Sequence, residues 1–192
     1  MNYIVNNPAL KLIRSTGVTL LIFLHVKPNQ LTIFGGVLAL VAGFVATTGS
    51  FTYAGLLFIL GSSMDGFDGE LARTTDTDSI QGAFLDSVFD RLGEGFLLIG
   101  VIYYLASVHD NLGVLLTVGA LFFSLLVSYS RARGESLGLD SSGGIAPREV
   151  RVVIVCFSLL ISSAFYALMA LLVFLSAVTF LQRSIKAFRS SN

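Results

Sequence analysis

Residues 65–90 read DGFDGELARTTDTDSIQGAFLDSVFD and place four aspartates, Asp65, Asp68, Asp86 and Asp90, within sequence that is otherwise apolar. At about 100° per residue, Asp65 and Asp68 share one face of a helix, and Asp86 and Asp90 share one face of the next. The pairs 68/86 and 65/90 are both centred near residue 77, so an antiparallel helical hairpin brings the two members of each pair to matching depth. The stretch therefore predicts two adjacent helices whose carboxylates converge.

Four neighbouring carboxylates require a positive counter-charge, because they cannot all remain ionised while unpaired. Ligation by oxygen alone suits a hard cation such as Mg²⁺, Mn²⁺ or Ca²⁺ rather than zinc. Gly66, Gly69 and Gly82 lie beside the aspartates, where missing side chains let a bulky ligand approach the backbone. We therefore expect the four aspartates to hold one or two divalent metal ions, Mg²⁺ or Mn²⁺.

The chain as a whole is strongly apolar. Of its 192 residues, 54% are hydrophobic and 12% are charged, with a mean hydropathy of +0.82, whereas a soluble domain carries about twice that share of charge. The final apolar run, 152–181, would be about 45 Å long as one helix, too long for a single crossing, so we divide it into two helices. We predict an all-α integral membrane protein, one domain over 1–192, with an interfacial amphipathic helix at 8–27 and six transmembrane helices near 30–48, 51–75, 79–106, 111–134, 147–166 and 168–189.

Basic residues set the expected orientation, because Lys and Arg are retained on the cytoplasmic side of short loops. With six spans and the N-terminus inside, every Lys and Arg falls on the cytoplasmic half, whereas five spans would leave one basic end outside. We therefore expect both termini and the aspartates on the cytoplasmic side of the cytoplasmic membrane. Membrane lipids are the expected surroundings, and no nucleic acid is expected as a partner.

A motif within this stretch resembles the signature of the CDP-alcohol phosphotransferase family. The run Asp65-x-x-Asp68-Gly69-x-x-Ala72-Arg73, then after eight residues Gly82-x-x-x-Asp86-x-x-x-Asp90, is similar to that signature at all eight positions. Residues 28–32, PNQLT, resemble the family's entry to its first span. The resemblance implies metal-dependent transfer from a CDP-alcohol lipid to a second alcohol with release of CMP, six helices after an interfacial one, and a homodimer.

The resemblance also implies a role for each matching residue. Asp65, Asp68 and Asp86 would hold the metal that bridges the donor pyrophosphate. Asp90 would be the general base for the acceptor hydroxyl, with a second role as a metal ligand. The CDP pocket would be formed by Asn29, Thr32, Gly69, Ala72, Arg73 and Gly82.

Two later segments bear on the acceptor. Residues 128–135, SYSRARGE, and 147–151, PREVR, contribute Arg131, Arg133, Arg148 and Arg151. Arginine binds phosphate in a bidentate manner, so these side chains predict an anion pocket for a phosphorylated polyol, with Arg133 and Arg151 as the leading choices. The first segment resembles that of family members that make phosphatidyl- or archaetidyl-inositol phosphate from inositol 1-phosphate, whereas the second departs from them by lacking a preceding Glu. Inositol 1-phosphate is therefore the expected acceptor.

Other functions are compatible with parts of the pattern. Glycerol 3-phosphate is an alternative acceptor, as in a phosphatidylglycerophosphate synthase, and a CDP-inositol donor that yields a soluble phosphodiester is another alternative. An ion transporter is the alternative from a different class, because carboxylates inside a membrane also mark ion paths. Such a path should have polar residues through its outer half, yet 51–64 and 96–106 are nearly free of them.

Overall fold

The computed structural model describes residues 17–190. Residues 17–23 are helical, and they are followed by α3 (Pro28–Ala46), α4 (Phe51–Thr74), α5 (Ile80–Ser107), α6 (Asn111–Ser136), α7 (Arg148–Leu160), the short 3-10 helix η1 (Ser162–Ala164) and α8 (Phe165–Ser190). The all-α prediction is confirmed, with no strand between residues 17 and 190. Residues 8–16 of the predicted interfacial helix lie outside the described part.

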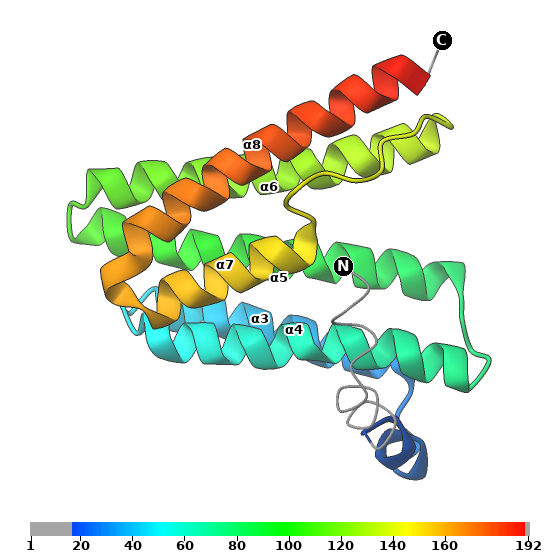
Figure 1. Cartoon of the computed structure of the whole chain (residues 1–192). Helices are drawn as coiled ribbons and strands as arrows, with labels where there is room; N and C mark the ends of the chain where they lie inside the picture. Colours follow the sequence, from blue (N-terminus) through cyan, green and yellow to red (C-terminus); the bar gives the residue numbers. More distant parts are fainter. Residues whose placement is uncertain (1–16, 191–192) are drawn as a thin grey trace.

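α3, α4, α5 and α6 run nearly parallel to one another, and α8 crosses them obliquely (Figure 1). α3 packs against α4 and α5, α7 packs against α4 and α8, and α6 packs against α5 and α8. The start of α3, the α4–α5 connection, the α6–α7 loop and the C-terminal end of α8 all gather at one end of the bundle (Figure 1). This end, called the polar end below, is the one toward which the aspartate-bearing halves of α4 and α5 extend.

Three segments are long and apolar enough to cross a membrane, namely α3, α6 and Ser162–Ser190. Helices α4, α5 and α7 do not meet this criterion of length and composition, each for an identifiable reason. α4 and α5 have 24 and 28 residues but carry the charged cluster, and α7 has 13 residues, or about 20 Å against a hydrocarbon core of about 30 Å. α7 ends six residues before the predicted limit of 166, because η1 turns the chain at Ser162–Ala164 without Gly or Pro.

Two glycines allow α3 and α4 to touch beside the aspartates. A Cβ on Gly35 would lie 2.8 Å from the carbonyl oxygen of Gly61, and a Cβ on Gly61 would lie 2.7 Å from that of Gly35. Both are shorter than side chains tolerate, so the backbones meet only because neither residue has a side chain. This contact sets the depth of α3 against the first aspartate of α4, four residues after Gly61.

Candidate active site

Three aspartates from two helices form the centre of the site. One carboxylate oxygen from each of Asp65, Asp68 and Asp86 lies within 4.8 Å of the others. Thr32 of α3 donates a 2.5 Å hydrogen bond to Asp68 Oδ2, which fixes this buried carboxylate. Asp86 Oδ1 is buried and has no hydrogen-bond partner within residues 17–190. A buried carboxylate oxygen without a donor, beside two further carboxylates, fits a hard divalent cation.

Asp90 is held by an arginine that it shares with Asp65. Arg148, the first residue of α7, lies 2.6 Å from Asp90 Oδ1 and 2.9 Å from Asp65 Oδ2. Its guanidinium therefore bridges Asp65, which belongs to the group of three convergent aspartates, and Asp90, which lies beside that group. The positive charge offsets the repulsion between these two acids. This bridge joins α4, α5 and α7 through a single side chain.

A cavity of about 490 Å³ adjoins the aspartates at the polar end. Asp68 and Asp86 line it, as do the six residues predicted for CDP binding, Asn29, Thr32, Gly69, Ala72, Arg73 and Gly82. Its rim also includes residues that sequence reasoning did not select, Thr77, Asp78, Ser79, Ile80 and Ala83. Ser79 could have been selected from the sequence, because serine is a preferred N-cap residue. In the structure it is the N-cap of α5 and accepts a 3.0 Å hydrogen bond from Gly82 N.

Gly69 and Gly82, which both line the cavity, differ in how closely other atoms surround them. A Cβ on Gly82 would lie 3.0 Å from Ser79 Oγ and 3.2 Å from Asn29 Oδ1, so the α5 entry is tight. A Cβ on Gly69 would meet only the Arg73 guanidinium, at 3.5 Å. The packing of the helices therefore does not require glycine at position 69, and the missing side chain leaves open space on the cavity side.

The sequence matches the family model described as CDP-alcohol phosphatidyltransferase over residues 25–181. That span contains every aspartate of the site and most of the chain. This protein belongs to the CDP-alcohol phosphatidyltransferase family. It is therefore a transferase of phospholipid synthesis, and its apolar helices make it an integral membrane enzyme.

Relatives and solved structures agree with the family assignment. The chain is 36% identical over 172 residues to an archaetidylinositol phosphate synthase of Pyrococcus horikoshii, covering 85% of each protein. It is 33% identical over 135 residues to a phosphatidylinositol phosphate synthase of Cutibacterium acnes, covering 68% of this chain and 64% of that one. Its fold is similar to that of the phosphatidylinositol phosphate synthase of Mycobacterium tuberculosis with CDP-DAG bound, with a TM-score of 0.86, 26% identity and 93% and 94% of the two chains covered. The same enzyme in complex with manganese and citrate also gives a TM-score of 0.86 at 26% identity, over 92% and 90% of the chains.

The four arginines predicted for the acceptor occupy three different settings in this transferase. Arg148 bridges Asp65 and Asp90, as described above. Arg131 and Arg133 are exposed near the end of α6, where Arg131 pairs with Glu135 at 2.8 Å and Arg133 lies 3.5 Å from Ser136 Oγ. Arg131 and Arg133 thus lie on the surface of α6, whereas Arg148 contacts the aspartates of α4 and α5.

Arg151 is deeply buried, with 2% of its surface exposed. It lies 3.5 Å from Glu94 Oε2 and 3.3 Å from Ser128 Oγ, while Nε has no partner within residues 17–190. Glu94 continues the Asp86/Asp90 stripe by helical spacing and serves here as the partner of Arg151. α5, α6 and α7 are thus joined by a buried polar cluster one turn from Asp90.

Arg183 of α8 is a further buried arginine of this region, and sequence reasoning did not select it. It is buried and donates to the carbonyl oxygens of Gly143 at 2.8 Å and Val127 at 2.7 Å. It lies close enough to Arg131 and Arg151 for their positive charges to repel one another. In the sequence it reads as one more basic residue near a helix end. Only the packing of α8 on α6 reveals its setting.

Proposed function

We propose that this CDP-alcohol phosphatidyltransferase moves the phosphatidyl-type group of CDP-diacylglycerol, or of its ether analogue, onto inositol 1-phosphate and releases CMP. The observation that carries the proposal is the continuity of two features. The cavity lined by the six expected CDP-binding residues shares Asp68 and Asp86 with the convergent aspartates. A donor seated there would place its pyrophosphate against those carboxylates.

Asp65, Asp68 and Asp86 would hold the divalent metal, Mg²⁺ or Mn²⁺. When bound, such an ion neutralises charge on the donor phosphates and so favours departure of CMP. Thr32 keeps one Asp68 oxygen in place, and the Asp86 oxygen that has no hydrogen-bond partner within residues 17–190 is available as a ligand. Gly69 leaves room for the donor to pass close to the α4 backbone.

Asp90 is the proposed general base. The acceptor hydroxyl oxygen forms a bond to the lipid-bearing phosphorus, the bond from that phosphorus to the CMP oxygen breaks, and the hydroxyl proton passes to the Asp90 carboxylate. Arg148 fixes this carboxylate at 2.6 Å and holds it next to Asp65. Asp90→Asn should lower kcat by about a hundredfold or more while the donor KM changes little, because a base acts mainly in the transition state. A near-normal kcat would assign the base elsewhere.

A group of arginines supports a phosphorylated acceptor. Arg131, Arg151 and Arg183 lie near one another, and the carboxylates close to them are Glu94, Glu135 and Glu149. Arginine suits a phosphate monoester, and the Nε of buried Arg151 offers a donor without a partner in the described chain. We therefore add Arg183 to the predicted acceptor residues Arg131, Arg133, Arg148 and Arg151.

We further propose six membrane spans in a homodimer, with the polar end on the cytoplasmic side. The described basic residues of the loops and helix ends, including Lys27, Arg73, Arg131 and Arg189, belong to segments at this end. Retention of positive charge in the cytoplasm supports that orientation. A CDP-lipid could then enter from the surrounding bilayer, and a water-soluble acceptor could enter from the cytoplasm.

The test is CMP release by purified enzyme with CDP-diacylglycerol and its ether analogue against inositol 1-phosphate, glycerol 3-phosphate and unphosphorylated inositol. We expect turnover with inositol 1-phosphate and little with inositol, since loss of a charge-assisted contact costs about tenfold to hundredfold in binding. Arg183→Gln should raise the acceptor KM more than the donor KM. Preferred use of glycerol 3-phosphate would show that the proposed acceptor is wrong. Equal use of inositol and inositol 1-phosphate would show that the proposed acceptor arginines do not form a phosphate-binding site.

A further inference from the structure

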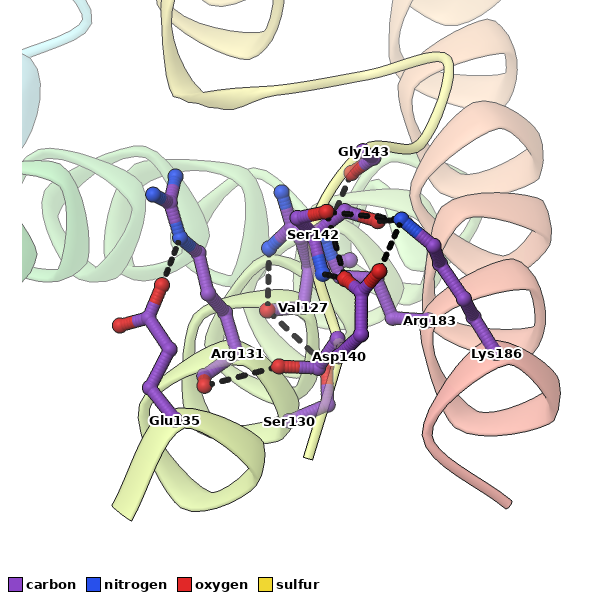
Figure 2. Close-up of polar contacts among 10 residues, drawn as sticks. Val127, Ser130, Arg131, Glu135, Asp140, Ser142, Gly143, Arg183 and Lys186 are labelled. Atoms are coloured by element: carbon purple, nitrogen blue, oxygen red, sulfur yellow. Dashed lines mark hydrogen bonds and ion pairs between the residues drawn. The ribbon is translucent and has the colours of Figure 1, made fainter. Parts of the chain in front are cut away.

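The segment preceding α7 is tied along its length to one face of α8. We call residues 140–146 the strap. Thr179 Oγ1 accepts from Ala146 N at 2.9 Å, Gln182 Oε1 accepts from Ile145 N at 3.2 Å, and Ser190 Oγ accepts from Asp140 N at 2.9 Å. Arg183 donates to Gly143 O at 2.8 Å, and Lys186 contacts Ser142 Oγ at 2.8 Å and Asp140 Oδ2 at 2.9 Å. Figure 2 shows Lys186 and Arg183 meeting the strap from the α8 side.

These contacts have a regular register. The α8 residues that make them, Thr179, Gln182, Arg183, Lys186 and Ser190, follow the spacing of a single helix face. As the strap advances from 140 to 146, its partners move back along α8 from 190 to 179. The α8 side chains thus satisfy backbone groups that neither a helix nor a strand would satisfy here.

The other side of the strap contacts α6. Ser141 donates to Arg131 O at 3.1 Å, and Arg183 extends past the strap to Val127 O. Figure 2 shows Val127 and Arg131 on the α6 side, with Asp140 facing Lys186. Lys186 and Ser142 lower the pKa of Asp140 to about 2 from an ordinary value of 3.8, so Asp140 stays charged at any pH at which the enzyme would be assayed. The strap is therefore held on both sides under working conditions.

The end of the strap determines where Arg148 begins α7. Ala146 is fully buried, its N–H is fixed by Thr179, and Pro147 follows with its restricted φ. The next residue is Arg148, whose guanidinium bridges Asp65 and Asp90. We propose that Thr179 and Gln182 are positioning residues, which act through the strap to place Arg148 between the two carboxylates. The inference rests on the proposed role of Asp65 and Asp90 in the transfer.

The experiment combines hydrogen exchange with kinetics on the full-length enzyme. Thr179→Val keeps the shape of the side chain but removes the acceptor for Ala146 N, whereas Thr179→Ser restores an acceptor. We expect Thr179→Val to speed amide exchange in residues 140–148 and to lower kcat in CMP release by about tenfold to a hundredfold, as misplacement of a catalytic group does. The donor KM should stay within about twofold, and Thr179→Ser should recover both properties.

Thr117→Val is the matched control. Thr117 is fully buried in α6 and its hydroxyl donates to Gly113 O at 2.8 Å, so the change removes a similar bond without touching the strap. If Thr179→Val fails to fold, exposed Gln182 provides the second test, because Gln182→Leu loses the acceptor for Ile145 N and Gln182→Glu keeps one. Faster exchange with an unchanged kcat would overturn the positioning role, and so would a lowered kcat with unchanged exchange. Absence of transfer in the parent enzyme would instead contradict the proposed function, because the exchange result does not depend on activity.

Discussion

At the scale of single residues, Gly69 is a position where helix stability and ligand binding favour different side chains. It lies inside α4 next to Asp68, where glycine costs helix stability of about 0.5–1 kcal/mol relative to alanine. The space around it would accept a side chain, since the nearest atom to an added Cβ is 3.5 Å away on flexible Arg73. The residue lines the cavity, so we propose that a ligand, and not the packing of the fold, favours glycine at this position.

Gly69→Ala should therefore stabilise the protein slightly and impair donor binding. We expect unfolding free energy to rise by up to about 1 kcal/mol while the donor KM increases by about tenfold, equivalent to about 1.4 kcal/mol. Gly95→Ala is the control, because Gly95 is also inside a helix and an added Cβ has its nearest neighbour 3.9 Å away on Leu121, outside the cavity. It should share the gain in stability and leave KM unchanged. An unaltered donor KM in Gly69→Ala would show that the CDP moiety does not approach α4 there.

At the scale of helices, the sequence predicted those parts that depend on local periodicity. The spacing along helices α4 and α5 led us to expect that four aspartates, Asp65, Asp68, Asp86 and Asp90, converge. The structure brings oxygens of the first three within 4.8 Å of one another, and Asp90 is linked to Asp65 through Arg148. The turn between α7 and α8 could not be placed, because η1 contains no Gly or Pro and is set by packing. The roles of Arg151 and Arg183 were equally hidden, since their neighbours come from α5, α6 and the strap rather than from their own helices.

The approach of α3 to α4 gives a prediction at this scale. Gly35→Ala would press a methyl group against Gly61 O at 2.8 Å, which forces the two helices apart. Overpacking of this kind costs about 1–3 kcal/mol, more than the helix propensity gained. The midpoint of thermal unfolding in detergent should fall, whereas Gly95→Ala should not lower it. A rise in both variants would mean that the α3–α4 contact is looser than the structure indicates.

At the scale of the whole molecule, the bundle keeps its charged chemistry at one end and its apolar surface along its length. Asp65, Asp86 and Arg148 lie where α4, α5 and α7 meet near the polar end, and the strap closes the same end from α8. Charged groups within membrane helices are costly unless they face partners or a polar cavity, and here they have both. This arrangement suits an enzyme that takes a lipid donor from the bilayer and an ionic acceptor from water.

Metal dependence of CMP release tests this account most directly. Purified enzyme with CDP-diacylglycerol or its ether analogue and inositol 1-phosphate should lose CMP release in excess EDTA and regain it when Mg²⁺ or Mn²⁺ is added beyond the chelator. Asp86→Asn should need more metal for half-maximal rate, because it alters the carboxylate whose buried oxygen has no partner within residues 17–190. Full turnover in excess EDTA would contradict the central claim that Asp65, Asp68 and Asp86 hold a metal required for the transfer.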